Sequence, residues 1–386
     1  MRFFRLGLAI LLFAVSATAA APSRRNASAP CVRPPARQMP DGATIVLSET
    51  ARFPCTLQFV NTGLVLRVDP AGKVEDIGSS VSRGPDGRLY TSNGRSGQVT
   101  VWNADGSFQR NFGSPGAGPG EFGVGGKVIF FDQNGRLIIG TNNRLLIYST
   151  AYDFVAAVPP LGNGIYSGAL LADGNFLSAR GATDAAFRIV DLNQQSNAQV
   201  PRILRSFGPA RSSGYVPGKI SYSGGTTFWA GPENGIGLGY VLDLWRTNGT
   251  HVRTIRRDVP WMPRGIGATT TGRLPPPEME VMHEDGTGLV FVAMMVPNST
   301  FLTLSASDRQ NPDPNGPVNN AIDIYLEVID ANAGVVLASA GPIHPSEAIK
   351  QIPTGFFAGS RQGYRREEDS NGFGLMRIVE YQLIAR

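Results

Sequence analysis

The chain is poor in charged residues and in histidine, and each shortage narrows what it can do. Charged side chains make up 17% of its 386 residues, below the roughly 25% of an average soluble domain. The net charge is +5 without any run of lysine or arginine, so we expect no nucleic-acid partner. Three histidines are too few to favour a multi-histidine metal centre or a histidine-based nucleophile relay. We therefore predict no metal and no cofactor.

Long hydrophobic runs are also scarce, and the one that stands out lies at the N-terminus. Arg2 and Arg5 precede a twelve-residue apolar run at 6–17, and Ala-Thr-Ala at 17–19 is a small-x-small cleavage site. Twelve residues of helix span about 18 Å, too little for a bilayer core of about 30 Å. We predict a signal peptide at 1–19 and a periplasmic or secreted protein with no membrane span after cleavage. The alternative is an uncleaved anchor.

Cysteine occurs only twice, at Cys31 and Cys55. In an exported protein an even pair favours one disulfide, and two cysteines cannot make the usual structural zinc site. Proline, alanine, serine and arginine dominate the start of the segment 20–55, which we predict to be a flexible leader. The disulfide would tie this leader to the first strand.

Glycine and proline are abundant instead, with 47 and 28 residues, and they separate short runs rich in β-formers. A tight Asp-Gly or Asn-Gly turn entering a strand recurs at 85–90, 133–138 and 172–177. A second half-unit, Val-Thr-Val-Trp-Asn-Ala-Asp-Gly at 99–106, recurs as Leu-Asp-Leu-Trp-Arg-Thr-Asn-Gly at 242–249. A repeat of roughly 40–50 residues built from two hairpins indicates β-propeller blades.

The repeat predicts an all-β fold, a six-bladed β-propeller over 56–386 with four antiparallel strands in each blade. The sixth unit shows only three strands, so we expect an N-terminal strand at 56–66 to complete that blade and close the ring. We also expect a monomer. The predicted units are 80–113, 127–161, 166–208, 220–258, 278–342 and 347–386.

Two segments carry a resemblance to a known family. Phe-Gly-Ser-Pro-Gly-Ala-Gly-Pro-Gly-Glu-Phe at 112–122 resembles the inter-blade signature of NHL-repeat six-bladed propellers. Asn-Asn-Arg-Leu-Leu-Ile-Tyr at 142–148 is similar to their Asn-Arg-apolar strand motif. The resemblance covers the first three units and implies an exported bacterial propeller with a signal, a short leader and a closing strand.

Candidate chemical groups are isolated in the sequence. His251 and His283 stand beside hairpin turns, and we interpret both as ordinary surface or turn residues. The run Asp-Ala-Asn-Ala-Gly at 330–334 has alternating oxygen ligands, so it is either a calcium site like that of propeller lactonases or a capped turn. Asp369 is a further isolated carboxylate. No catalytic residue can be named.

The connections from the second to the third strand of each blade are the best candidates for a binding surface. They would emerge on one face around the axis, so they converge without being close in sequence. Their arginines could form an anion-accepting mouth, or the loops could simply be a polar rim. The candidate ligand-binding residues are Asn93, Arg95, Asn142, Arg180, Glu233 and Arg361.

Two functional hypotheses follow. The first is an exported non-catalytic binding scaffold that offers its loop face to a protein, peptide or glycan, an inference that rests partly on fold analogy. The alternative is a metal-dependent lactonase-, esterase- or lyase-like propeller with an axial ion. Two long segments, 259–277 and 297–320, interrupt the repeat and are either functional or disordered.

Overall fold

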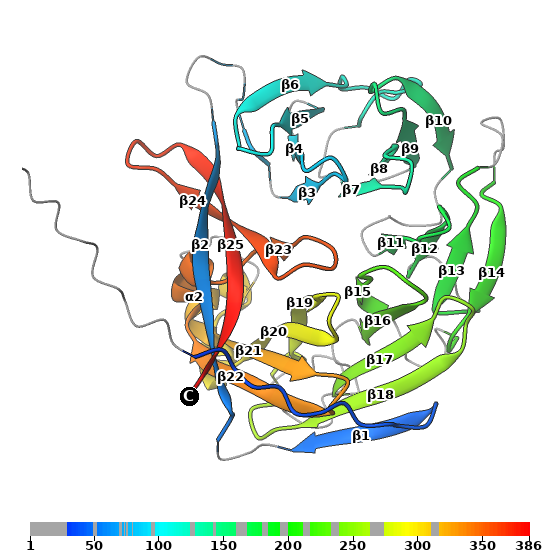
Figure 1. Cartoon of the computed structure of the whole chain (residues 1–386). Coiled ribbons are helices and arrows are strands. Elements are labelled where there is room, and N and C mark those ends of the chain that lie inside the picture. The colour runs from blue at the N-terminus through cyan, green and yellow to red at the C-terminus, as the bar shows by residue number, and fades with distance from the viewer. Residues whose placement is uncertain are drawn as a thin grey trace, which may run out of the picture.

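In the computed structural model, six four-stranded antiparallel sheets stand in a ring as the blades of a β-propeller (Figure 1). This confirms the predicted fold class. The predicted signal peptide 1–19 lies outside the residues that the structure describes. Those residues are 29–48, 52–68, 72, 74, 76–78, 80–93, 97–123, 128–141, 144–159, 168–179, 184–193, 200–210, 217–232, 239–262, 274–309 and 316–386.

Each blade has its first strand nearest the axis and its last strand at the rim. Blade one contains β3 (Val81–Arg83), β4 (Leu89–Asn93), β5 (Gln98–Trp102) and β6 (Phe108–Phe112). Blade two contains β7 (Val128–Phe131), β8 (Leu137–Gly140), β9 (Leu145–Tyr148) and β10 (Phe154–Val158). Blade three contains β11 (Gly168–Leu170), β12 (Phe176–Ser178), β13 (Phe187–Val190) and β14 (Ile203–Phe207).

The other three blades include both ends of the chain. Blade four contains β15 (Pro217–Ser221), β16 (Thr227–Pro232), β17 (Tyr240–Arg246), β18 (His251–Asp258) and the added β1 (Ala43–Ser48). Blade five contains β19 (Glu278–Glu284), β20 (Leu289–Pro297), β21 (Ile322–Asp330) and β22 (Val335–Ile343). Blade six contains β23 (Gly355–Phe356), β24 (Gln362–Glu368), β25 (Gly374–Ala385) and β2 (Cys55–Arg67).

The predicted tight turns join first to second strands. In blade one, Gly87 has a φ of +81°, which glycine adopts without strain, and the Asp86 carboxylate accepts the Arg88 amide at 3.0 Å. The middle strands that follow, such as β8 and β9, are buried at every position because neighbouring blades cover both faces of the sheet. Turn chemistry and continuous apolar runs together therefore specify each blade.

The core consists of hydrophobic clusters at the junctions between neighbouring blades. At the junction that closes the ring, Leu66 of β2 and Met376 and Ile378 of β25 pack with Leu89 and Trp102 of blade one. Leu66, Leu89, Met376 and Ile378 have no exposed surface. The last blade therefore contributes a full interface to the first.

Ring closure is made by the N-terminal strand predicted at 56–66. β2 pairs antiparallel with β25, from Cys55 opposite Ala385 to Arg67 opposite Leu375. Pairing the two ends of the chain in one sheet gives the C-terminal strand a partner on both edges.

Residues 29–48, here named the N-terminal strap, run across the rims of blades six, five and four. Cys31 is joined to Cys55 by a disulfide, and its amide donates to the Leu383 carbonyl at 3.0 Å. The strap ends in β1, which pairs in parallel with β18 as a fifth strand of blade four. Residues 43–48 of the leader predicted at 20–55 thus form a strand of the propeller.

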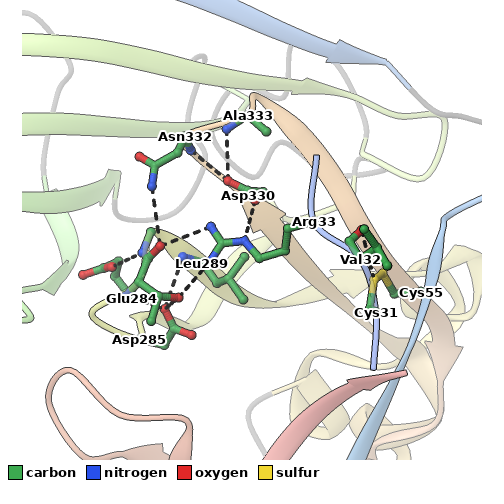
Figure 2. Close-up of polar contacts among 12 residues, drawn as sticks. Cys31, Val32, Arg33, Cys55, Glu284, Asp285, Leu289, Asp330, Asn332 and Ala333 are labelled. Atoms are coloured by element: carbon green, nitrogen blue, oxygen red, sulfur yellow. Dashed lines mark hydrogen bonds and ion pairs between the residues drawn. A yellow bond between two sulfur atoms is a disulfide. The ribbon is translucent and has the colours of Figure 1, made fainter. Parts of the chain in front are cut away.

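Over blade five the strap is fixed by Arg33. Its Nε donates to the Asp330 carboxylate at 2.7 Å (Figure 2). Its two terminal nitrogens donate to Thr287 at 3.1 Å each. Asp330 and Thr287 belong to the two turns of blade five on one face of the ring. One side chain therefore links the strap to both hairpins of that blade.

The segment resembling the NHL signature forms a loop that blade two holds. Arg144 donates to the Gly118 and Glu121 carbonyls at 2.8 and 3.0 Å, and the Glu121 carboxylate accepts the Gly118 amide at 2.7 Å. Phe122 is completely buried between blades one and two. These residues have a structural role.

Helical segments are short and lie outside the blades. The β20–β21 insertion contains the 3₁₀ helices η3 (Ser299–Thr303) and η4 (Pro317–Ala321) and the helix α1 (Ala306–Arg309), and α2 (Pro345–Gln351) precedes blade six. None of the helices in the described part of the chain has the length and apolar character to cross a membrane. Residues 310–315 of the insertion and 263–273 of the other long connection lie outside the described residues.

Candidate functional site

An axial channel of about 440 Å³ is lined by the first strands of the six blades. Figure 1 shows these strands at the centre of the ring. The first strand of a blade has a sheet neighbour on one side only, so its other edge faces the axis. Every blade contributes to the lining, and the volume lies within the usual range of about 300–1,000 Å³ for small-molecule sites. The lining segments are 80–83, 128–131, 168–170, 219–222, 280–283 and 354–358, with Tyr364.

The two faces of the ring differ in the connections that they carry. Successive strands of a blade are antiparallel, so first-to-second turns emerge on one face, the turn face, and second-to-third connections on the other, the loop face. The first-to-second turns meet one another on the turn face. A Cβ at Gly286 of blade five would lie 3.1 Å from the Gly359 carbonyl oxygen of blade six, and one at Gly135 would lie 3.9 Å from Pro85.

Arg83 is the cation of the lining that is nearest the turn face. It ends β3, and its guanidinium carbon lies 4.1 Å from the centroid of the Phe357 ring of blade six. Burial lowers the pKa of Arg83 because the lining removes water from the charged form. Among the residues that the structure describes, no carboxylate lies within ion-pair distance of this guanidinium.

His283 is buried in the same end of the lining. Its Nε2 lies 2.6 Å from the Ser360 carbonyl oxygen, which can only accept, so Nε2 carries the proton. The imidazole stacks on Phe356 with ring centroids 4.7 Å apart. Burial lowers the pKa of His283 to about 4, so the ring is neutral at pH 7. The interpretation of His283 as a surface or turn residue was wrong, because β19 extends through Glu284 and places it in the lining.

Hydroxyl groups of the lining connect neighbouring blades. Ser82 of blade one donates to the Ile129 carbonyl of blade two at 2.8 Å. Tyr222 of blade four accepts the Ala172 amide of blade three at 2.9 Å, and Ser221 accepts the Glu284 amide of blade five at 2.7 Å. With the bond from His283 to blade six, these contacts hold the lining in one arrangement.

Arg361 does not lie where the sequence placed it. It falls between β23 and β24, which are the first and second strands of blade six, so it is on the turn face. There its Nε donates to the buried Asp285 carboxylate of blade five at 2.9 Å. The sixth unit has the three strands that were expected, but the connection at Arg361 was assigned wrongly. Because β23 has only two residues, the turn after it was taken for a second-to-third connection. Arg361 therefore cannot join the loop-face residues in one mouth.

The other candidate binding residues belong to second-to-third connections. Arg95, Asn142, Arg180 and Glu233 lie outside the described residues. Asn93 is the last residue of β4, and only its backbone is described. The strands that flank these four positions are the second and third strands of blades one to four.

The sequence candidates for calcium ligands that the structure describes are engaged within their own turns. The Asp330 carboxylate accepts the amides of Asn332 and Ala333 at 3.0 Å each, in addition to Arg33 (Figure 2). Asp369 accepts the amides of Asn371 and Phe373. Within the described ranges, no three His, Cys, Asp or Glu side chains are grouped to hold a metal ion.

Sequence reasoning missed the channel residues themselves. Arg83 occupies the third position of a three-residue strand, and Lys219 and Glu280 lie on the corresponding strands of blades four and five. The sequence does contain a signal for the lining, because each of these residues comes a few positions before a first-to-second turn. This spacing identifies a channel residue only when one knows which strand of each blade is innermost.

Comparison with known proteins gives the fold. No family model and no curated protein matches the chain. A protein from Bacteroides fragilis NCTC 9343 that is named "Putative exported protein" is similar in structure, with a TM-score of 0.53, 14% identity, and coverage of 87% of this chain and 99% of that one. A member of the DUF4221 family from Bacteroides vulgatus has a TM-score of 0.53 at 10% identity, covering 85% and 99%. Both similarities support a six-bladed β-propeller.

Proposed function

We propose that the chain is an exported, non-catalytic binding scaffold of the NHL-like six-bladed type, with the axial channel as its ligand site. The observation that carries the proposal is the lining itself. It combines aromatic, cationic and small side chains from six blades around about 440 Å³, and hydrogen bonds between blades fix its polar groups. A rigid, mixed lining of this kind favours selective binding.

The hydrogen bonds of the lining support binding over nucleophilic catalysis. A serine nucleophile needs a base that faces its hydroxyl. Among the described residues, the Ser221 hydroxyl is hydrogen-bonded to no histidine and accepts the Glu284 amide, while His283 donates to the Ser360 carbonyl. These groups hold the blades together.

Export is proposed from the apolar N-terminal run and the cysteine pair, and one structural neighbour is named "Putative exported protein". We propose a monomer in the periplasm or outside the cell, with the loop face as the contact surface for a protein, peptide or glycan. The NHL-like assignment rests on the segment 112–122 and its place between blades one and two.

Filling the channel tests the proposal. Val128 lines the channel, whereas Val155 is 50% exposed on β10 at the rim, so Val128→Trp and Val155→Trp are matched variants. A soluble fragment library would be screened by ligand-observed NMR against the unmodified protein and both variants. We expect saturable binders that Val128→Trp weakens at least tenfold and Val155→Trp leaves unchanged. Equal binding to both folded variants, or no saturable binder, would overturn the proposal.

A further inference from the structure

Arg83 is a cation of the channel lining that has no ion-pair partner among the described residues. Arg83 is half-buried, and its guanidinium lies over the Phe357 ring at 4.1 Å. A guanidinium has five N–H donors, and removing them from water is unfavourable unless acceptors replace the water. Phe357 supplies a π face but no hydrogen-bond acceptor. Within the described residues, this arginine has neither a carboxylate nor a carbonyl partner.

Several polar side chains of the channel lining donate to backbone carbonyls. Ser82 donates to the Ile129 carbonyl, Tyr222 donates to the Gly225 carbonyl at 2.9 Å, and His283 donates to the Ser360 carbonyl. These three donors are therefore occupied, whereas no acceptor among the described residues is paired with the Arg83 guanidinium. An incoming acceptor would gain a charged donor that has no partner in the described lining.

The charge balance of the lining also favours an anion. Lys219 and Glu280 lie on the neighbouring strands β15 and β19 and carry opposite charges. His283 is neutral at pH 7 because burial lowers its pKa to about 4. Arg83 therefore determines the sign of the net charge along the described lining.

We propose that Arg83 binds the carboxylate of a small organic acid in the axial channel. This inference rests on the proposed binding function and names the ligand class for it. A planar guanidinium fork matches a carboxylate in two parallel hydrogen bonds. One arginine balances the single charge of a carboxylate, whereas a phosphate dianion would need a second cation beside it, and Lys219 belongs to blade four, opposite blade one in the ring.

The remaining lining indicates the body of this acid. Phe130, Phe131 and Phe356 line the same channel as Arg83. Aromatic side chains bind apolar and planar groups by burial and stacking. The favoured ligand is thus an acid with an aromatic or apolar body rather than a sugar acid.

The test compares an acid with its neutral amide. Binding of phenylacetate, phenylacetamide and galacturonate would be measured by ligand-observed NMR on the full mature chain. The variants are Arg83→Met, which keeps the apolar stem over Phe357, Arg83→Lys, and the control Arg205→Met on the exposed rim strand β14. We expect phenylacetate to bind at least tenfold more tightly than phenylacetamide or galacturonate.

The variants are expected to separate the effect of the Arg83 charge on binding from any effect on folding. Arg83→Met should weaken phenylacetate at least tenfold and leave phenylacetamide unchanged, Arg83→Lys should weaken phenylacetate less, and Arg205→Met should change neither. Equal affinity for acid and amide, unchanged phenylacetate affinity in Arg83→Met, or no binding of either acid would overturn the inference. If neutral fragments bind the unmodified protein but not Val128→Trp, while neither acid binds, the proposed binding function stands and the carboxylate as ligand class is wrong. If Arg83→Met fails to fold, the acid–amide comparison on the unmodified protein decides.

Discussion

Arg257 and Glu327 form a two-point ion pair that is buried between blades four and five. The Arg257 Nε lies 2.8 Å from one Glu327 oxygen, its Nη2 contacts the other, and both side chains are 1% exposed. The remaining terminal nitrogen donates to the Leu47 and Ser48 carbonyls at the end of β1. One arginine thus joins β18, β21 and the N-terminal strap.

Breaking this pair should strongly destabilise the fold. Glu327→Gln leaves the Arg257 charge buried without its partner, so we expect a loss of about 3–5 kcal/mol in the free energy of unfolding. The double variant Arg257→Met/Glu327→Leu removes both charges and should lose less. Urea denaturation of the three proteins measures this. A double variant less stable than Glu327→Gln would show that the pair is a net stabilising contact in itself.

Ring closure should depend on β2 far more than on the N-terminal strap. Removing residues 1–51 deletes β1 and the disulfide but leaves β2 paired with β25, so we expect a lower melting temperature and a cooperative transition. Removing residues 1–66 takes the fourth strand of blade six and the fully buried Leu66, and should abolish cooperative melting. A cooperative melt after the longer deletion would show that the ring closes without β2.

Two kinds of information determined how much could be predicted. The blades and the closing strand follow from local signals, because Asp-Gly turns and β-rich runs such as 85–90 specify hairpins wherever they occur. Arg83 and Arg361 depend on which strand is first in its blade, and β3 and β23 have only three and two residues. Strands that short have no periodicity, so the inner edge of the ring and the face of each turn become visible only after closure.

His283 should make stability depend on pH in a defined window. Burial holds its pKa at about 4 in the folded chain, against about 6.5 when unfolded. As the pH falls from 6.5 to 4, the unfolded chain takes up a proton that the folded chain does not. The free energy of unfolding should therefore fall by about 3 kcal/mol in total, with full stability retained above pH 6.5.

His283→Gln keeps an N–H donor for the Ser360 carbonyl and removes the titration, so its stability should vary less across this window. Asp285 affects the pH dependence of stability only at lower pH than His283 does. Burial alone would raise the pKa of Asp285, but hydrogen bonds from Thr287 and Arg361 outweigh it and lower that pKa. Denaturant melts at pH 7, 6, 5 and 4.5 isolate the histidine, and parallel pH profiles for both proteins would exclude it as the cause.

The Cys31–Cys55 disulfide should stabilise the folded chain. The bridge closes a loop across a sequence separation of 24 residues, for which the chain-entropy model gives about 3 kcal/mol. Exported protein should begin near Ala20 and contain no free thiol, and dithiothreitol should lower its melting temperature. A Cys31→Ser/Cys55→Ser variant provides the control, since reductant should leave its melting temperature unchanged. Two reactive thiols in the exported protein would contradict this expectation.

The three arginines that were expected to form one anion-binding mouth can be tested separately, because Arg361 lies on the turn face. Arg95 and Arg180 belong to second-to-third connections, whereas Arg361 lies on the opposite face and pairs with the buried Asp285. Replacing Arg361 with alanine should cost about 1–3 kcal/mol in stability, because Asp285 loses a charged hydrogen-bond partner.

The sequence predicts polar loops at Arg95 and Arg180, so the double variant Arg95→Ala/Arg180→Ala should instead change stability by less than about 0.5 kcal/mol per site. If these arginines bind an anionic peptide or sugar, losing their charge-assisted hydrogen bonds should weaken the complex about 10- to 100-fold. A binding screen against anionic peptides and sugars, with melts of each variant, measures both effects. Because Arg361→Ala removes the same charge from the other face, it should leave that binding unchanged. Unchanged binding in the double variant, with a normal melt, would leave the loop face as a polar rim without an anion site.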